Sequence, residues 1–181
     1  HALDYPCEKM ATFFVPANVR ILTQFSADKL ASYAEKTDFI ECGGAPLAHA
    51  DMLDLCRLLP KTRLYNTYAS TETGIISTYN YNDGRCLVGC LGKPMPHSRI
   101  IITPEGHISC QGATLMSGYI GEPELTATVL RDDTVSMADL GHIDDEGMLH
   151  IGGRLDDVIN VSGYKVAPTE VEDSALLLPD V

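Results

Sequence analysis

The chain has 181 residues, of which 45% are hydrophobic and 21% are charged, as in ordinary globular proteins. Its formal net charge of −12 argues against a surface that binds a nucleic-acid backbone, and no Lys/Arg run offsets that charge. No apolar run approaches the roughly 20 residues that a membrane helix needs, and no secretory signal is visible. We therefore expect a cytoplasmic protein with no integral membrane segment and no nucleic-acid partner.

The six cysteines include no CxxC pair. Cys86 and Cys90 are four positions apart, but no His-rich segment accompanies them, as a zinc site of this kind would require. We therefore expect reduced thiols. A metal-site protein built on Cys86 and Cys90 remains a remote alternative.

Residues 1–79 alternate between helical and strand patterns. Pro16 precedes the first helical pattern, Ser26 is a candidate N-cap of the second, and Pro60 stops the third. This order of strand, loop, helix and strand favours a parallel sheet that binds ligands at the carboxyl ends of its strands. We expect helices over residues 18–25, from the Ser26 cap to Lys36, and over residues 48–59, with strands over residues 38–42 and 63–67.

The pattern changes after residue 80, where Gly, Pro and Asp recur between short β-type runs. A hairpin signal at residues 104–106 joins strands that we expect over residues 99–103 and 107–111. A second turn, at residues 144–147, joins strands expected over residues 141–143 and 148–151. Short strands at this spacing are typical of a small barrel or sandwich.

From Arg154 onward, a short strand, a Gly-containing turn and another strand precede a helix that begins near Pro168. Glu170 and Glu172 in the first turn of that helix suit its macrodipole. We therefore expect three parts: a partial α/β subdomain over residues 1–79, a β-barrel-like subdomain over residues 80–152, and the beginning of a further domain over residues 153–181.

Two segments at strand ends carry residues that suit a nucleotide. The first contains Gly44, Ala45 and Pro46, where glycine lets the backbone approach a flat or charged ligand closely. In the second, Thr71 can bind a phosphate oxygen, and Glu72 can hold Mg²⁺. Tyr68, just before them, offers a flat face for a base. The alternatives are a plain tight turn and a polar Ser/Thr turn.

Two further segments carry charged residues beside glycines. Asp139, between a β-run and a Gly, can accept both hydroxyls of a ribose, although a lone Asp there also suits an Asx turn. Gly152 and Gly153 lead into Arg154, which can bind ribose or phosphate. Asp156 or Asp157 is a candidate hinge residue. The alternative for this last segment is a charged loop between strands.

Together these segments resemble the superfamily of adenylate-forming enzymes, which includes acyl-CoA synthetases, adenylation domains of peptide synthetases and luciferases. The resemblance covers almost the whole chain in the right order, and its last motif is the most specific. Its motifs are GGAPL, verbatim at residues 43–47; Y-G-x-T-E at 68–72; G…GYxG at 112–121, with Gly118 and Tyr119 intact; T-G-D-x-G at 137–141; and G-R-x-D-D-x-I-x-x-x-G with P-x-E-V/I-E at 153–163 and 168–172.

The resemblance implies an α/β fold followed by a mainly-β part: the partial N-terminal domain of such an enzyme, with the start of its α+β C-terminal domain. It also implies roles for eight residues around ATP or AMP. Gly44, Ala45 and Pro46 would contact the adenine, Tyr68 would pack on its face, Thr71 would bind the AMP phosphate, Glu72 would bind Mg²⁺, and Asp139 would hold the ribose with help from Arg154.

Three residues of the last motif would act in the second half-reaction of such an enzyme. Asp156 would be the hinge of the small C-terminal domain, Gly163 would line the path of the CoA pantetheine arm, and Lys165 would approach phosphate. The resemblance thus implies an AMP-forming acyl-CoA synthetase that joins a carboxylic acid to ATP and passes the acyl group to coenzyme A.

Residues 156–163 look more like the CoA-ligase branch than the carrier-protein branch. An adenylation domain that loads a carrier-protein pantetheine remains an alternative, because the same residues would serve it. A non-catalytic relative or binding module is the other alternative, because Ala69 and Ala138 stand where the family has Gly and Met137 stands where it has Thr. Pro16, Val19 and Ile21 suggest an apolar pocket wall, which favours fatty or aryl acids.

The family's phosphate loop and its catalytic lysine have no counterpart among these residues, and the chain begins with His1 rather than Met. Electrostatic stabilisation of the transferring phosphoryl group is usually the largest catalytic contribution. We therefore expect an internal fragment that has no adenylation activity by itself.

Overall fold

The computed structural model describes residues 6–83, 88–154, 157, 159–161, 164–166, 168–175 and 178. Its internal contacts form two compact units: His1–Thr67 with Tyr79–Val88, and Tyr68–Thr78 with Gly89–Val181. We call these the first and the second unit. The chain passes between them inside two strands, β3 (Arg63–Ser70) and β4 (Gly74–Asn80). The subdomain and domain boundaries expected after residues 79 and 152 stay predictions.

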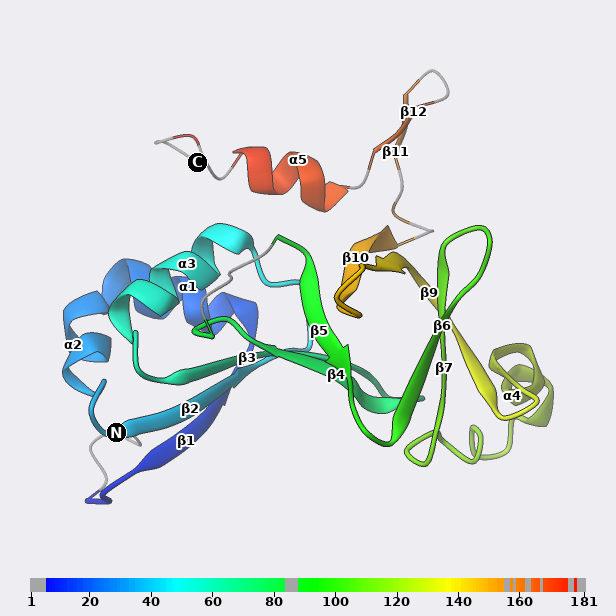
Figure 1. Ribbon diagram of the computed structural model, residues 1–181, viewed down its shortest axis with the longest axis horizontal. Helices are drawn as coiled ribbons and strands as arrows, with labels where there is room; N and C mark the ends of the chain where they lie inside the picture. Colours follow the sequence, from blue (N-terminus) through cyan, green and yellow to red (C-terminus); the bar gives the residue numbers. More distant parts are fainter. Residues whose placement is uncertain are drawn as a thin grey trace. The chain divides into compact units, whose positions relative to one another are not determined.

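The first unit contains a parallel sheet with helices between its strands. Strand β2 (Thr37–Cys42) pairs in parallel with β1 (Met10–Phe14) on one side and with β3 on the other. Figure 1 draws α1 (Pro16–Phe25), α2 (Ala27–Ser32) and α3 (His49–Leu58) together on one side of these strands. The predicted parallel sheet is confirmed, and β1 is an additional strand.

Helices α1 and α3 are joined by an ion pair, and each buries apolar side chains. Met52 and Leu55 of α3 are buried, and Arg20 Nη2 of α1 lies 3.0 Å from Asp51 Oδ2 of α3. Val19 of α1 is completely buried. The suggestion that Val19 lines an acyl pocket is therefore wrong, because its side chain belongs to the core of this unit.

Helix α2 is shorter than the sequence predicted, since it ends at Ser32 rather than Lys36. Ser26 does occupy the N-cap position, but its side chain makes no capping hydrogen bond. Beyond the helix, the N–H groups of Ala34 and Lys36 bond to the carbonyl oxygens of Ala31 and Tyr33, each three positions earlier. These turns tighten the backbone and lead it directly into β2.

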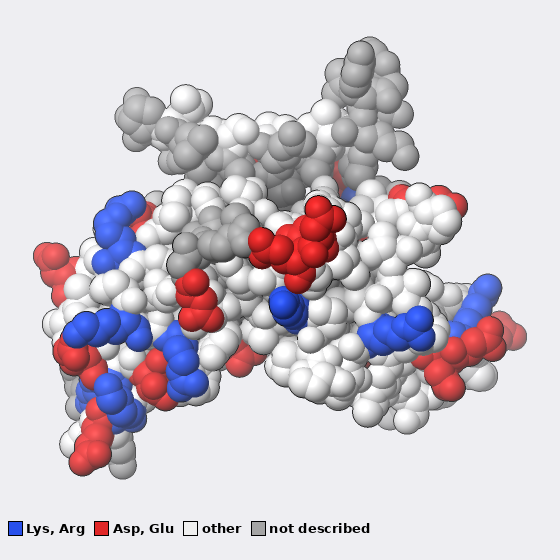
Figure 2. Space-filling view, in the orientation of Figure 1, with Lys and Arg blue, Asp and Glu red and all other residues white. Residues whose placement is uncertain are grey.

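Charged side chains on the first unit are arranged as exposed pairs. Arg63 Nη2 lies 2.6 Å from Asp38 Oδ2, and Lys61 Nζ lies 3.0 Å from Glu35 Oε1. Figure 2 accordingly shows Lys and Arg side chains interspersed with Asp and Glu over this part of the chain. Such exposed pairs contribute little to folding stability.

The second unit is built on antiparallel strands in the order β5-β10-β9-β7-β6. Both predicted hairpins are confirmed as β6–β7 and β9–β10; β6 has the expected length but begins one residue earlier, and the other three strands are longer than expected. The bounds are β5 (Cys90–Pro94), β6 (Ser98–Ile102), β7 (His107–Gly112), β8 (Leu130–Arg131), β9 (Thr134–Ile143) and β10 (Leu149–Arg154).

The remaining elements of this unit include one helix that the sequence reading missed. Helix α4 (Pro123–Val129) has Pro in its first turn and Glu124 beside it, which are ordinary helix-start signals. The predicted strand–turn–strand–helix order near the end of the chain is confirmed by β11 (Ile159–Val161), β12 (Tyr164–Val166) and α5 (Pro168–Ala175). No helix in the described ranges is both long and apolar enough to cross a membrane.

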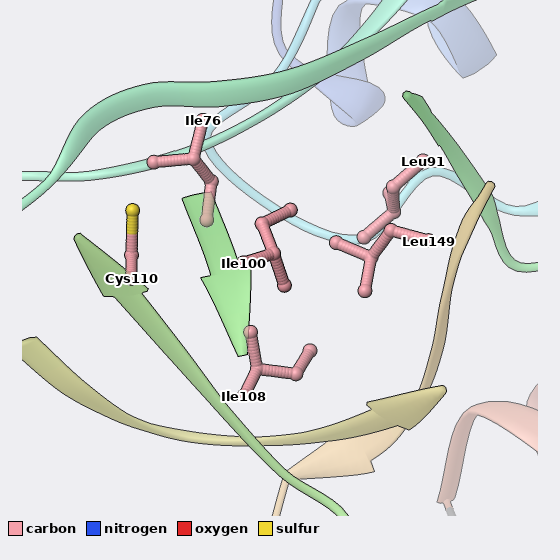
Figure 3. Close-up of a cluster of buried hydrophobic side chains, with 6 residues drawn as sticks. All are labelled: Ile76, Leu91, Ile100, Ile108, Cys110 and Leu149. Atoms are coloured by element: carbon pink, nitrogen blue, oxygen red, sulfur yellow. The ribbon is translucent and has the colours of Figure 1, made fainter. Parts of the chain in front are cut away.

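The core of the second unit joins five of its strands. Figure 3 shows side chains from β4, β5, β6, β7 and β10 converging in one cluster. Ile108 and Leu149 have no exposed surface. The side chains of Tyr68 and Met137 pack against the same cluster. The full cluster consists of Ile76, Leu91, Ile100, Ile108, Cys110 and Leu149.

The cysteines in the described ranges are free thiols, which agrees with the expectation of reduced cysteines. Burial raises the pKa of the Cys42 thiol to about 12, so this side chain stays protonated and unreactive near neutral pH. Cys90 is buried, whereas Cys86 lies outside the described residues.

Candidate functional site

Asp139 is the point at which three of the predicted site residues meet. The Tyr68 hydroxyl donates a hydrogen bond of 2.5 Å to Asp139 Oδ2, and Arg154 Nε lies 3.5 Å from Asp139 Oδ1. The two carboxylate oxygens therefore each have one partner. Residues at positions 68, 139 and 154 are thus brought together in one unit, although they are far apart in sequence.

The pairing of two strands explains this arrangement. Asp139 on β9 stands directly opposite Arg154 on β10 in the antiparallel ladder, so their side chains can reach one another. Tyr68 comes from the end of β3, and its ring is held against the apolar core cluster. The alternative of an Asx turn at Asp139 is wrong, because β9 continues through Gly141 to Ile143.

The electrostatics of the cluster favour a neutral Tyr68. Burial and the hydrogen bond to Asp139 together raise the pKa of the Tyr68 hydroxyl far above its usual range. The hydroxyl therefore remains a hydrogen-bond donor at any physiological pH. The carboxylate of Asp139 is mostly shielded, with 16% of its side chain exposed, whereas the Arg154 side chain is 58% exposed.

Thr71, Glu72 and Thr73 form the turn that joins β3 to β4. The Ser70 hydroxyl accepts hydrogen bonds of 3.2 Å from the backbone N–H groups of both Glu72 and Thr73. This is the local bonding by which serine favours a turn. The polar turn that we considered as an alternative is therefore present, and it places Thr71 at an exposed position beside Glu72.

The Glu72 carboxylate has a partner that the sequence reading did not assign. The Tyr119 hydroxyl donates a hydrogen bond of 2.7 Å to Glu72 Oε1. This bond is the main reason that the pKa of Glu72 lies below its usual range, so the side chain is ionised near neutral pH. The sequence signal was present, because Tyr119 is the tyrosine of the Gly-Tyr pair in the G…GYxG motif, but nothing in the motif indicated its partner.

The Glu72 carboxylate at this turn suits a magnesium ion that also binds phosphate. Mg²⁺ prefers oxygen ligands and is usually held by one or two carboxylates together with phosphate oxygens and water. Glu72 offers one partly exposed, ionised carboxylate. Among the residues that the structure describes, no three His, Cys, Asp or Glu side chains gather as a complete metal cage. Glu72 can thus supply one carboxylate oxygen to a magnesium ion, and its role in holding that ion stays a prediction.

Gly44, Ala45 and Pro46 lie in the first unit, in the exposed loop that follows β2. Gly44 has a φ of +84°, a conformation that favours glycine. A Cβ on neighbouring Gly43 would lie 3.2 Å from the carbonyl oxygen of Thr67, so this loop packs closely on β3. The predicted position at the carboxyl end of a parallel strand is confirmed, whereas the adenine contact stays a prediction.

The remaining site predictions concern the end of the chain. Asp156 and Gly163 lie outside the described residues. Lys165 belongs to β12, where it stands opposite Asn160, but its side chain is not among the described parts. The hinge, CoA and phosphate roles of these residues therefore stay predictions.

The chain is similar in sequence to a known enzyme family and to ligases. The family model described as "AMP-binding enzyme" matches residues 9–120. A long-chain-fatty-acid–CoA ligase of Bacillus subtilis is 32% identical over 123 residues, which are 62% of this chain and 22% of the ligase. This chain thus spans about a quarter or less of that relative's length.

Two solved structures share the fold over most of this chain. An amide bond synthetase, McbA from Marinactinospora thermotolerans, gives a TM-score of 0.85 at 27% identity and covers 95% of this chain and 37% of its own. The o-succinylbenzoate coenzyme A synthetase MenE from Bacillus subtilis, in complex with AMP, gives 0.77 at 25% identity with the same coverage. The fold expected from the resemblance, α/β followed by a mainly-β part, is confirmed, because this mixed, sheet-rich α/β chain matches both structures.

Proposed function

Because this chain belongs to the family of AMP-binding enzymes, we propose that the full-length protein activates a carboxylic acid with ATP. The acid oxygen attacks the α-phosphorus, the bond to pyrophosphate breaks, and acyl-AMP and pyrophosphate form. The thiol of coenzyme A then attacks the acyl carbon, and AMP leaves. The protein is thus proposed to be an AMP-forming acyl-CoA synthetase.

The observation that supports this proposal best is the contact of Tyr68, Asp139 and Arg154. A carboxylate accepts up to about four hydrogen bonds, and Asp139 has one partner on each oxygen. It can therefore still accept two ribose hydroxyls. Tyr68 and Arg154 hold the carboxylate in place before the nucleotide arrives, which lowers the ordering cost of binding.

At the phosphate end, we propose that Thr71 and Glu72 act together. The exposed Thr71 hydroxyl would donate to a phosphate oxygen, while the ionised Glu72 would hold Mg²⁺. When bound, that ion neutralises negative charge on the phosphates during the transfer. Gly44, Ala45 and Pro46 would contact the adenine, and Gly163 and Lys165 would act with CoA and phosphate after movement about Asp156.

The acceptor is the finer part of the proposal. The Bacillus ligase and MenE carry coenzyme A in their names, which supports CoA. The amide bond synthetase has a TM-score of 0.85, against 0.77 for MenE, so transfer of the acyl group to an amine is the second candidate. Loading of a carrier-protein pantetheine remains a further alternative. A role in fatty acid metabolism is proposed from the Bacillus ligase, and a cytoplasmic location from the sequence alone.

The test is carboxylate-dependent exchange of labelled pyrophosphate into ATP, catalysed by the full-length protein with a panel of fatty and aryl acids. Exchange that appears only with an acid supports the proposal, and its absence with the whole panel contradicts it. Release of AMP is then measured with CoA, with an amine and with a pantetheine carrier, and the acceptor that accelerates it is the substrate. We expect the isolated 181 residues to give no exchange.

A further inference from the structure

The hydrogen bond between Tyr119 and Glu72 joins segments that are 47 positions apart in sequence. It is one of several contacts between residues 114–119, which we call the support segment, and the turn that carries Glu72. The Met116 N–H donates a hydrogen bond of 2.8 Å to the carbonyl oxygen of Glu72. The Thr114 hydroxyl donates one of 2.7 Å to the carbonyl oxygen of Thr73. The support segment therefore fixes both the backbone and the side chain of the turn.

The fit between the two segments is close. Gly74, which follows the turn and begins β4, has a φ of +64°, and a Cβ there would lie 3.2 Å from Thr114 Cβ. A larger residue at Gly74 would thus push the support segment away and strain the backbone. Residues on both sides are matched to one specific arrangement of the turn.

Tyr119 is itself anchored from the opposite side. Its backbone N–H donates a hydrogen bond of 2.9 Å to the Thr126 hydroxyl on α4. That hydroxyl in turn donates a hydrogen bond of 2.9 Å to the carbonyl oxygen of Glu122. A Cβ on Gly118, whose φ is +144°, would lie 3.0 Å from Thr126 Cγ2. Glycine at 118 therefore lets the chain pass α4 closely enough for Tyr119 to reach Glu72.

We infer that Tyr119 is a positioning residue that orients the Glu72 carboxylate toward Mg²⁺·ATP, with the support segment as its base. The inference rests on the proposed nucleotide site. The hydroxyl donates to a carboxylate oxygen rather than to the backbone, and that carboxylate stays partly exposed. Partners that orient a metal ligand in this way typically change metal affinity about 10- to 100-fold when removed.

The test uses Tyr119→Phe in the full-length protein, which removes the hydroxyl and keeps the ring. ATP affinity is measured by calorimetry with excess Mg²⁺ and again with EDTA. We expect the strengthening of ATP binding by Mg²⁺ to fall about 10-fold, while the affinity in EDTA stays unchanged. A role in folding alone would lower both affinities equally, and that result would overturn the inference, as would an unchanged response to Mg²⁺.

Two further variants make the result specific. Tyr65→Phe removes a phenolic hydroxyl from the first unit and is expected to leave both affinities unchanged. Glu72→Gln is expected to abolish the Mg²⁺ response, and adding Tyr119→Phe to it should then have no further effect, because the two residues act as one unit. An additional loss in the double variant would contradict the inference.

The inference and the proposed function can fail separately. If ATP binding responds to Mg²⁺ through Glu72 and Tyr119 but no acid supports pyrophosphate exchange, the inference stands and the proposed reaction does not. If Mg²⁺ has no effect on ATP binding by the unmodified protein, the positioning role of Tyr119 is wrong, whatever the exchange assay gives.

Discussion

The Tyr68 hydroxyl lies 2.5 Å from Asp139 Oδ2, and this contact connects the end of β3 to the middle of β9 within the second unit. Because the ring of Tyr68 also packs on the apolar core, the position of Asp139 depends on the packing of that core. The proposed ribose contact of Asp139 would therefore couple binding to folding, and each can be tested by its own substitution.

The first prediction concerns Tyr68→Phe at high pH. The raised pKa of Tyr68 means that its contribution to stability is present below about pH 10, where unfolded tyrosine is neutral, and is lost as pH rises toward the folded value. The free energy of unfolding of the unmodified chain should thus fall above pH 10, by up to about 1.4 kcal/mol per pH unit from this residue. The free energy of unfolding of the Phe variant should fall less steeply.

Urea unfolding between pH 7 and pH 11 measures this difference. At pH 7 the variant should be less stable by about 1.5–3 kcal/mol, since it loses a hydrogen bond to a charged group. Equal slopes above pH 10 for the two chains would show that Tyr68 is not the protected hydroxyl.

The second prediction concerns Asp139→Asn. The amide can still accept from Tyr68, and the exposed Arg154 loses little by losing its partner, so folding should change by less than about 1 kcal/mol. Ribose hydroxyls would lose a charged acceptor, which lowers the affinity for ATP by at least about 10-fold. Calorimetry on the full-length protein measures both effects.

Asp133→Asn is the matched control for that substitution. Asp133 is exposed in a turn and has a φ of +55°, which asparagine tolerates well. The Asp133→Asn substitution removes the same charge elsewhere in the same unit. A similar loss of ATP affinity in both variants would mean that net charge, rather than a ribose contact, explains the result.

How far the sequence predicts this molecule depends on how local each feature is. Pro16 and Pro60 mark helix ends correctly, because proline effects act within one turn, and Ser26 occupies the predicted N-cap position without a side-chain capping hydrogen bond. The length of α2 was overestimated, because its end is set by the backbone turns that lead into β2. Helix α4 was missed although Pro123 signals it, because its short sequence has no buried face that periodicity could detect.

The candidate site shows the same limit. Its residues could be chosen by resemblance, but their partners could not. Nothing local indicates that Tyr119 would donate to Glu72 or that Tyr68 would donate to Asp139, because each bond joins segments brought together by long-range packing. The pairing of Asp139 with Arg154 depends on the register of β9 and β10, which shifts between Ile151 and Gly153, and sequence spacing does not reveal that shift.

The third prediction concerns Gly141→Ala. A Cβ at Gly141 would collide with the carbonyl oxygen of His150 and would lie 2.9 Å from Ile108 Cδ1. We expect a loss of stability of about 1–3 kcal/mol, because overpacking shifts backbone that cannot easily give way. Gly141 is two positions from Asp139, so ATP affinity should fall as well.

Gly152→Ala is the control for Gly141→Ala in the same hairpin. The nearest neighbour of its Cβ would be the Leu140 carbonyl oxygen at 3.7 Å, an ordinary contact. Its stability should stay within about 0.5 kcal/mol of the unmodified chain. Thermal and urea unfolding of both variants measure the difference, and equal stabilities would contradict the close packing described for Gly141.

The last prediction tests the core that supports the site. Ile108 has no exposed surface and packs between strands of the second unit, so Ile108→Ala should cost about 2–5 kcal/mol of unfolding free energy through lost burial and a cavity. Ile120 is fully exposed, and Ile120→Ala should change stability by less than about 0.5 kcal/mol. Both substitutions remove the same atoms from the same unit, so urea unfolding isolates the effect of burial.

Because Tyr68 packs on the Ile108 cluster and holds Asp139, ATP affinity should also fall in Ile108→Ala at temperatures where the variant remains folded. Unchanged affinity there would mean that the Asp139 carboxylate keeps its position without support from the core.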